Sequence, residues 1–148
     1  MMRISTKGRY GIKAVVDLAL NKEEGVIPLK SIAARQGISE NYLEQLLAIL
    51  RKAGIVRSVR GANGGYYIEK DLSEIFVGDI LRALEGSLSP VECTEEGANC
   101  IKSNECITKI LWEKVKKNID AAVDSTTLKD LLEEYERTKN NRQNMYYI

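Results

Sequence analysis

Histidine is absent from this 148-residue sequence, and cysteine occurs only three times. Without an imidazole, a Ser-His or Cys-His catalytic pair and a Cys/His zinc finger are excluded. The sequence also lacks a phosphate-binding Gly-rich loop and a recognisable pair of catalytic carboxylates, so we do not expect an enzyme. The odd number of cysteines argues against a disulfide framework.

Long hydrophobic runs are also missing. No stretch approaches the roughly 18 consecutive apolar residues that a membrane span needs, and residues 1–10 are basic and polar, without the apolar core of a secretory signal. The apolar share of 44% is nevertheless enough for a packed core. We therefore expect a cytoplasmic protein with no membrane partner, built as one domain or as a small domain with an oligomerisation element.

The net charge of +1 conceals an uneven distribution. Residues 1–70 hold 12 Lys and Arg against six Asp and Glu, a balance of +6, whereas residues 71–148 hold 10 against 15, a balance of −5. A basic half joined to an acidic half suggests that the first half meets a polyanion, with nucleic acid as the leading candidate. A chance fluctuation of surface charge is the alternative at this point.

The basic half has the outline of a helix-turn-helix. Apolar residues at three- and four-residue spacing predict a first helix over residues 6–21. A short helix over 29–36 ends at Gly37, and Ser39 can cap a longer helix over 40–53. Two helices joined by such a short turn form the motif by which many proteins bind DNA.

The helix over residues 40–53 sorts its side chains by type. With about 100° between successive residues, the polar and apolar positions fall on two faces that do not overlap. The apolar face carries Tyr42, Leu43, Leu46, Leu47, Ile49 and Leu50, and the other face carries Glu40, Asn41, Glu44, Gln45, Ala48, Arg51 and Lys52. One face is therefore expected in the core, and the other is available to the major groove, where Asn pairs with adenine and Glu accepts from cytosine.

A β-hairpin is predicted directly after this helix. Residues 55–60 and 65–69 are rich in β-branched and aromatic side chains, and the Asn63-Gly64 pair between them is a strong hairpin signal. A hairpin here corresponds to the wing of a winged helix-turn-helix, and a short helix over 77–85 follows it. Its arginines complete the predicted DNA-binding set, which is Ser39, Asn41, Glu44, Gln45, Arg51, Arg57 and Arg60. A helical scaffold without DNA contact is the alternative, but it explains neither the basic charge nor these arginines.

All three cysteines lie in, or at the end of, a segment without helical or strand periodicity, residues 87–105. Their spacing is C-x6-C-x5-C, over Cys93, Cys100 and Cys106. Zinc prefers four ligands and paired C-x2-C knuckles, which are absent. An iron–sulfur cluster accepts three thiolates and one other ligand. A redox-sensing thiol pair and three unconnected thiols are the alternatives.

The acidic half is expected to end in two helices. An apolar stripe over residues 106–123 predicts a long helix, and Thr127 with Asp130 resembles a capping box before a last helix over 128–137. The stripe either packs on the winged domain or pairs with a second copy of the chain. We favour dimerisation, because two-fold proteins bind palindromic half-sites. Residues 138–148 are expected to form a polar tail.

Several stretches of the sequence resemble the Rrf2 family of bacterial winged-helix transcription regulators. They are MRISTKGRYGIKAVVDLAL at 2–20, SENYLEQL at 39–46 and VRGANGGY at 59–66. The similarity covers nearly the whole chain, and DSTTL at 124–128 and the terminal YYI are most similar to the family's cysteine-metabolism repressor. The three cysteines instead resemble the ligands of the family's iron–sulfur regulators.

The resemblance assigns roles to single residues. It implies that Glu44 discriminates between bases, that Arg60 of the wing contacts DNA, and that the three cysteines bind an iron–sulfur cluster, with 2Fe–2S expected in preference to 4Fe–4S. Related iron–sulfur regulators have a His three residues after the third cysteine, where this chain has Lys109. The family's nitric-oxide sensor has an Asp where this chain has Arg9. The fourth ligand is therefore open among a solvent molecule, a residue of a partner subunit, Glu92, Glu95, Glu96 and Glu105.

The expected protein is mostly α-helical with a small β-hairpin wing: a winged helix-turn-helix domain followed by a long dimerisation helix. We divide it into a DNA-binding domain (1–86), a cysteine-bearing sensor loop (87–106), dimerisation helices (107–137) and a tail (138–148). The expected function is a homodimeric repressor or dual regulator that binds a palindromic double-stranded DNA operator, acts on iron–sulfur or sulfur metabolism genes and is controlled by an iron–sulfur cluster. The alternative is a cysteine-metabolism repressor without a cluster, which senses through redox thiols or a partner enzyme of the cysteine-synthase type.

Overall fold

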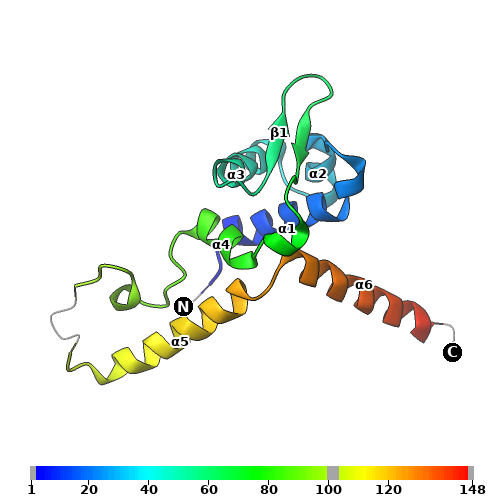
Figure 1. Ribbon diagram of the computed structural model, residues 1–148. Helices are drawn as coiled ribbons and strands as arrows, with labels where there is room; N and C mark the ends of the chain where they lie inside the picture. The colour runs from blue at the N-terminus through cyan, green and yellow to red at the C-terminus, as the bar shows by residue number, and fades with distance from the viewer. Residues whose placement is uncertain (1–2, 100–103, 147–148) are drawn as a thin grey trace.

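The computed structural model describes residues 3–99 and 104–146 and confirms a mostly helical fold with an antiparallel hairpin. The α-helices are α1 (Thr6–Leu20), α2 (Leu29–Gln36), α3 (Glu40–Lys52), α4 (Val77–Glu85), α5 (Ile107–Asp124) and α6 (Leu128–Met145). The hairpin and the short 3-10 turns are β1 (Arg57–Val59), β2 (Gly65–Tyr67), η1 (Lys22–Glu24), η2 (Leu72–Glu74) and η3 (Glu92–Thr94). Figure 1 shows the first four α-helices and the hairpin as one body, from which α5 and α6 extend in opposite directions.

Local signals define the helix-turn-helix. α2 ends at Gly37, whose φ of 63° is left-handed, a conformation that glycine adopts at little cost. α3 begins where Ser39 Oγ accepts a hydrogen bond from the backbone N–H of Tyr42 at 3.2 Å. The turn between the two helices is therefore short and defined at both ends, which fixes where α3 starts.

Three elements differ from their predicted bounds by more than one residue, and one of them is β2, which ends at Tyr67 instead of residue 69. The first strand is shorter than the predicted 55–60, because Ile55 and Val56 are buried in the core before the chain enters the sheet. The last helix is longer than the predicted 128–137 and continues to Met145, through most of the segment expected to be a tail. That segment contains no Gly or Pro, so nothing in its local sequence ends the helix.

The core lies between α1 and the helix-turn-helix. α1 packs against α2, α3, α4 and α6. The carboxylate of Asp17 on α1 is only 3% exposed, and it accepts hydrogen bonds from Arg35 Nη2 at 2.7 Å and from Gln36 Nε2 at 2.9 Å. These bonds satisfy a buried charge and join α1 to the end of α2. Of the predicted apolar face of α3, the four leucines are buried, and Tyr42 and Ile49 are half-buried against the core; the leucines are Leu43, Leu46, Leu47 and Leu50.

The turn between α5 and α6 is tied to the winged domain. The backbone N–H of Val77 donates to the carbonyl of Thr126, and the N–H of Leu128 donates to the carbonyl of Ile75, both at 2.9 Å. α5 itself contains no fully buried side chain. The apolar residues of its N-terminal end are 86%, 73% and 51% exposed, for Ile107, Ile110 and Leu111 respectively. This part of the predicted apolar stripe is uncovered in the single chain.

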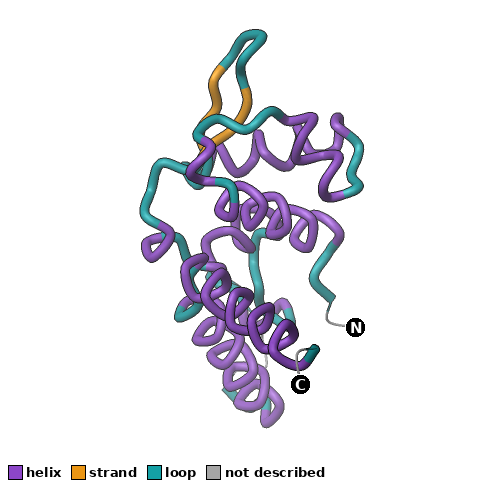
Figure 2. Tube along the Cα trace, turned by 90° about the vertical axis from the view of Figure 1, so that its right-hand side faces the viewer, coloured by secondary structure: helices purple, strands orange, loops and turns teal. Residues whose placement is uncertain are grey.

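A second view shows how the layers are stacked. In Figure 2 the hairpin lies at one end of the molecule, the long C-terminal helices lie at the other, and the remaining helices lie between them. The two ends of the molecule are therefore separated by the core. None of the helices in the described ranges is long and apolar enough to cross a membrane.

Candidate nucleic-acid interface and cysteine segment

The exposed face of α3 carries the polar side chains that the sequence predicts for base reading. Asn41, Glu44 and Gln45 are exposed, and none of them has a hydrogen-bond or ion-pair partner within residues 3–99 and 104–146. The leucines of the opposite face are buried in the core, so the helix cannot turn this face inward. Ser39, at the start of the helix, is also exposed. These polar groups are therefore held outward, where a ligand can reach them.

The hairpin is anchored beside the helix-turn-helix. Tyr66 of β2 pairs with β1 on one side and with Ile27 on the other, where two backbone hydrogen bonds of 2.8 Å join the residues. Gly65 is required at this close approach, because a Cβ there would lie 2.1 Å from the carbonyl oxygen of Ile27. The wing is thus fixed to the segment that leads into α2.

The three predicted arginines differ in their partners. Arg51, in the last turn of α3, donates to Ser58 Oγ of β1 at 3.3 Å and so links the helix to the wing. Arg57 forms an ion pair with Glu69 across the hairpin. Arg60 is exposed and has neither a hydrogen bond nor an ion pair within the described part of the chain. Of these arginines, Arg60 is the one most available to a polyanion.

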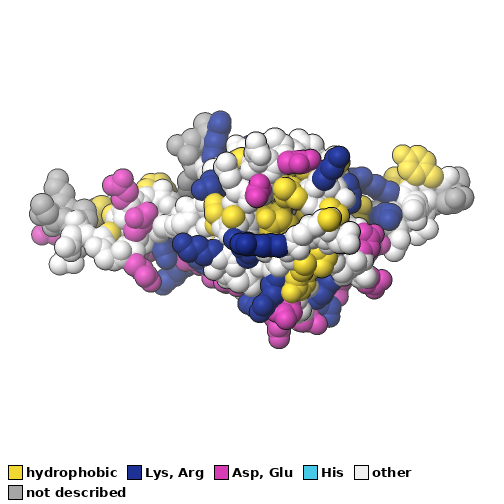
Figure 3. Space-filling view, turned by 90° about the horizontal axis from the view of Figure 1, so that it is seen from above, with side chains coloured by type: hydrophobic (Ala, Val, Ile, Leu, Met, Phe, Trp, Pro, Cys, Tyr) yellow, Lys and Arg dark blue, Asp and Glu magenta, His cyan; other side chains and the backbone are white. Residues whose placement is uncertain are grey.

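A concavity of about 420 Å³ lies where α3 meets the wing, lined by Arg51, Arg57, Ser58 and Tyr67 among others. Figure 3 looks down on the molecule from the hairpin end, where Lys and Arg side chains are spread over the central body with a few acidic side chains among them. Guanidinium and hydroxyl groups are typical donors to phosphate oxygens. An outward polar helix next to such donors is the combination with which winged proteins read a DNA groove.

The structure describes two of the three predicted cysteine ligands. Cys93 lies in η3, and Cys106 immediately precedes α5; both are half-buried free thiols. Because η3 contacts α5, the two thiols belong to adjacent elements. Cys100 lies outside the described residues. Among the residues that are described, no three potential ligand side chains are close enough together to hold a metal ion, so a three-thiolate set depends on Cys100.

Cys106 has the chemistry of a thiolate ligand. Its Sγ lies 3.2 Å from the hydroxyl oxygen of Thr108. This hydrogen bond, followed by one from the backbone N–H of Lys109, lowers the pKa of the Cys106 thiol. Its place at the N-terminus of α5 adds the positive end of the helix dipole. Because the thiolate is the form that binds iron, the donor chemistry fits an iron–sulfur cluster.

The candidates for a fourth ligand within the chain itself are carboxylates. Glu92 lies beside Cys93 in η3, and like the other three candidate glutamates it is exposed. Lys109 stands where the family resemblance implies a histidine ligand, and its Nζ lies 3.8 Å from Glu113 Oε1. A protonated ammonium has no lone pair for iron, so Lys109 does not replace that histidine.

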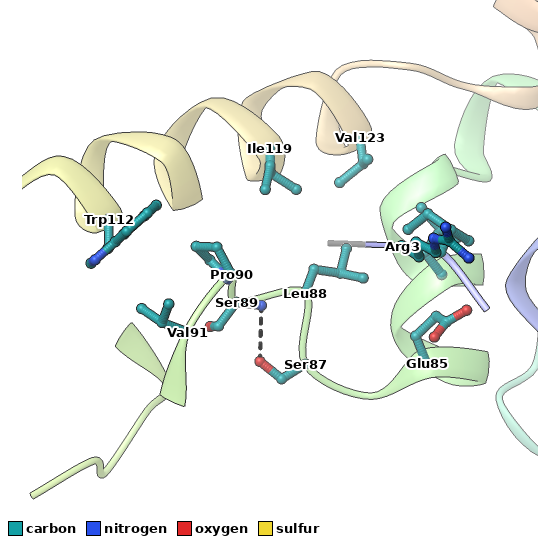
Figure 4. Close-up of a pocket in the computed structure, with 12 residues that line it drawn as sticks. Arg3, Glu85, Ser87, Leu88, Ser89, Pro90, Val91, Trp112, Ile119 and Val123 are labelled. Carbon is teal, nitrogen blue, oxygen red and sulfur yellow. Dashed lines mark hydrogen bonds between the residues drawn. The ribbon is translucent and has the colours of Figure 1, made fainter. Parts of the chain in front are cut away.

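A cavity of about 800 Å³ beside this segment was not predicted. Figure 4 shows Trp112, Ile119 and Val123 of α5 on one side of it, facing Leu88 and Pro90 on the other. The helical spacing of the three α5 residues predicts that they lie on an apolar stripe, but it does not predict which part of the stripe faces this cavity. The predicted apolar stripe therefore divides into one part that faces residues of its own chain and another, at the N-terminal end of α5, that is uncovered.

Known proteins share both sequence and fold with this chain. The sequence matches the model of the Rrf2 family, described as an iron-dependent transcriptional regulator, over residues 4–134. The HTH-type transcriptional regulator IscR of Escherichia coli (strain K12 / DH10B) is 42% identical over 135 residues, which cover 91% of this chain and 83% of the relative. The structure of T. potens IscR is 50% identical, with a TM-score of 0.75 and coverage of 93% and 90% of the two chains. CymR (YrzC), the global cysteine regulator of B. subtilis, is 46% identical, with a TM-score of 0.72 and coverage of 88% and 96%.

The family match begins before α1 and ends within α6. It therefore includes the helix-turn-helix, the hairpin and the cysteine-bearing segment, the features from which the site is built. The chain belongs to the Rrf2 family of transcriptional regulators, which makes it a DNA-binding regulator and not an enzyme.

Proposed function

We propose that this Rrf2 regulator binds a palindromic operator as a homodimer, and that an iron–sulfur cluster in the cysteine-bearing segment (residues 87–106) controls its affinity for DNA. The observation that carries the first part is the row of unpartnered polar side chains on α3, next to the exposed Arg60 of the wing. A polar face held outward on a helix is what base reading in the major groove requires. The regulator acts as a repressor or dual regulator in the bacterial cytoplasm, where the chromosome lies.

Each side chain of the interface has a role that follows from its chemistry. Asn41 and Gln45 can pair with adenine, and Glu44 can accept a hydrogen bond from the cytosine amino group. A carboxylate near phosphates is repelled unless it finds such a donor, so Glu44 also penalises wrong bases. Arg60 reaches a phosphate or a narrow minor groove. The remaining members of the set contact the DNA backbone, namely Ser39, Arg51 and Arg57.

The dimer interface is assigned to α5. Its exposed residues Ile107, Ile110 and Leu111 form an apolar surface at the end of the helix that extends away from the winged domain. Pairing with the same helix of a second chain would remove this surface from water. Two-fold symmetry then places the two winged domains on half-sites that are about one helical turn, or a multiple of it, apart.

The proposed cluster ligands are Cys93, Cys100 and Cys106, with 2Fe–2S as the expected type and a carboxylate, solvent or partner residue in the fourth position. When bound, the cluster supplies a redox-active group. The segment that would hold the cluster connects α4 of the winged domain to α5. A change in the conformation of this segment when the cluster binds can therefore alter how the two winged domains of a dimer are placed. The target genes are those of iron–sulfur or sulfur metabolism. Control is allosteric if the loaded and empty forms differ in DNA affinity.

A second candidate function is favoured by the 46% identity with the global cysteine regulator of B. subtilis. In that case the chain represses cysteine-metabolism genes through a partner enzyme of the cysteine-synthase type, and its cysteines act as redox thiols. A visible absorption spectrum of protein purified without oxygen separates the two candidates, because only the iron–sulfur cluster absorbs in the visible range.

Substitution of two DNA-binding side chains should have different consequences. Glu44→Ala is expected to reduce discrimination at one base pair, by about 1–3 kcal/mol, because the carboxylate no longer rejects wrong bases there. Arg60→Ala is expected to weaken binding to all sequences to a similar extent, because phosphate and minor-groove contacts carry little sequence information. The measurement is the dissociation constant for an operator selected from random duplexes and for each of its single-base variants.

The matched control is Glu136→Ala, which removes an exposed carboxylate from α6 and should change neither affinity nor base preference. Circular dichroism checks that each variant is folded. If Glu44→Ala unfolds the protein, or lowers affinity equally at every base pair, Glu44 is not the residue that discriminates bases.

A further inference from the structure

One guanidinium joins α4 of the winged domain to α5. Arg82 Nη1 donates to Asp124 Oδ1 at 2.6 Å, and Arg82 Nη2 donates to Asp124 Oδ2 at 3.1 Å and to Asp120 Oδ1 at 2.8 Å. We call these three residues the Arg82 clamp. A planar guanidinium that is bonded to two carboxylates restricts the orientation of the two helices as well as their distance.

Both helices are built for this contact. Asp120 and Asp124 are four residues apart and therefore share one face of α5. Gly78 lies four residues before Arg82 on α4, and it leaves the necessary room, because a Cβ there would lie 2.0 Å from Asp124 Oδ1 and 2.7 Å from Arg82 Nη1. Burial acts to raise the pKa of Asp120, but hydrogen bonds from Lys116 and Arg82 outweigh it and lower that pKa. The hydrogen bonds with Asp124 and Asp120 also raise the pKa of Arg82, so the clamp stays charged.

In the described part of the chain, α5 is joined to the winged domain at its C-terminal end, whereas towards its N-terminal end it contacts η3 of the cysteine-bearing segment. The Arg82 clamp and the backbone bonds of the α5–α6 turn fix its C-terminal end to the winged domain. The exposed apolar residues at 107–111 lie at its other end. The 18 residues of α5 span about 27 Å at about 1.5 Å per residue. A tilt of about 10° at the clamp would move the far end by about 5 Å, which exceeds the roughly 3.4 Å rise of one base pair.

We propose that the Arg82 clamp determines which spacing of operator half-sites this regulator accepts. The inference rests on the proposed function, because it requires a dimer that pairs through α5 and reads two half-sites. The winged domains lie at the anchored ends of the two α5 helices, and the dimer contact lies at their far ends. The angle that the clamp holds therefore sets the distance between the two α3 helices. Arg82 is a positioning residue, which acts on DNA only through the placement of α3.

The test is a selection of bound duplexes from a random library, performed with the full chain and with its Arg82→Met variant. The unaltered chain is expected to select an inverted repeat with a single spacing, and Arg82→Met is expected to select the same half-sites at several spacings. In titrations, insertion of one base pair between the half-sites should weaken binding by the unaltered chain about tenfold, the scale of one misplaced base contact, and binding by Arg82→Met less than about threefold.

Two further variants define the effect. Lys129→Met is the matched control, because it removes a cation that pairs with Glu133 at 3.8 Å on α6, outside the clamp, and it should keep the single spacing. Arg82→Lys retains the positive charge but cannot bond two carboxylates in the fixed geometry of a guanidinium. Its spacing preference should therefore lie between that of the unaltered chain and that of Arg82→Met. A positional role predicts this graded loss of spacing preference at constant half-site sequence, whereas a general loss of stability does not.

Circular dichroism and gel filtration establish that the variants are folded and dimeric, as expected because partly exposed ion pairs add little to stability. If Arg82→Met does not fold, Asp124→Asn weakens the clamp from α5 and serves in its place. The inference is overturned if the clamp variant is folded and dimeric, still selects one spacing, and still binds about tenfold more weakly when one base pair is inserted between the half-sites. Selection of isolated half-sites by the unaltered chain overturns the proposed function instead, so the two failures are distinguishable.

Discussion

Replacement of Cys93, Cys100 or Cys106 by alanine, one at a time, is expected to abolish iron–sulfur binding. Three thiolates anchor the proposed cluster, and the chain has no histidine to take the place of a lost one. Cys93 and Cys106 lie outside the apolar core of the described residues, so the variants should keep their helices and their dimer. The measurements are the iron and sulfide content and the visible spectrum of protein purified without oxygen, with circular dichroism and gel filtration on the same samples.

A histidine introduced to supply the fourth ligand should stabilise the cluster, in contrast to the cysteine substitutions. With no histidine, the iron in that position is open or held by a carboxylate, and we expect the cluster to be lost in air because solvent and oxygen reach it. Lys109→His adds an imidazole where the ammonium cannot bind iron, and it should make the cluster persist longer.

The control for the cysteine substitutions is Asn99→Ala, at an exposed neighbour of Cys100, which should retain the iron content of the unaltered chain. A cluster that survives replacement of all three cysteines would show that they are not its ligands. Iron content near zero in the unaltered chain, prepared without oxygen, would leave the cysteine-metabolism regulator as the better candidate.

Affinity for the operator is expected to fall by about three orders of magnitude between roughly 50 and 200 mM salt. Arg51, Arg57 and Arg60 are exposed in each chain, so a dimer can bring twice that number of guanidiniums to phosphates. Each phosphate contact releases condensed counterions and adds about −0.9 to the slope of log affinity against log salt, which gives a slope near −5 for the dimer. Fluorescence anisotropy titrations of a labelled operator at several salt concentrations measure this slope.

Two variants separate the interface arginines from general charge. Arg60→Met should make the slope of log affinity against log salt less negative by about 2 for a dimer, because each chain loses one phosphate contact. Arg137→Met, which removes an exposed cation that pairs with Glu134 at 3.3 Å on α6, should leave the slope unchanged. Equal affinity at the two salt concentrations, or full-affinity binding of a single half-site by a monomer, would contradict a phosphate-contacting dimer.

The elements of the winged domain could be predicted from the sequence because their signals are local. The helices at 29–36 and 77–85 have the predicted bounds, Gly37 ends one of them, and Ser39 caps the next. The outward face of α3 follows from the same periodicity, because the buried leucines determine which side chains point to solvent. Caps, stop residues and a 3.6-residue period each depend only on near neighbours in the sequence.

Contacts between distant residues could not be predicted in this way. Arg82 and Gly78 meet Asp120 and Asp124 only because α4 crosses α5, and no local pattern marks them. The apolar stripe of α5 serves two surfaces, so its periodicity does not separate the part that faces residues 88–91 from the part that is uncovered. The extension of α6 was also unmarked, because a solvated helix needs no apolar stripe.

Control of DNA binding by the cluster is tested most directly by one titration, performed without oxygen. The affinity of a single preparation for its selected operator is measured before and after the cluster is removed, with the iron content determined in both samples. We expect the loaded and empty forms to differ by about fivefold or more in operator affinity, the lower end of allosteric coupling between sites. Equal affinity of the loaded and empty forms, with iron present in the first and absent from the second, would contradict control of DNA binding by the cluster.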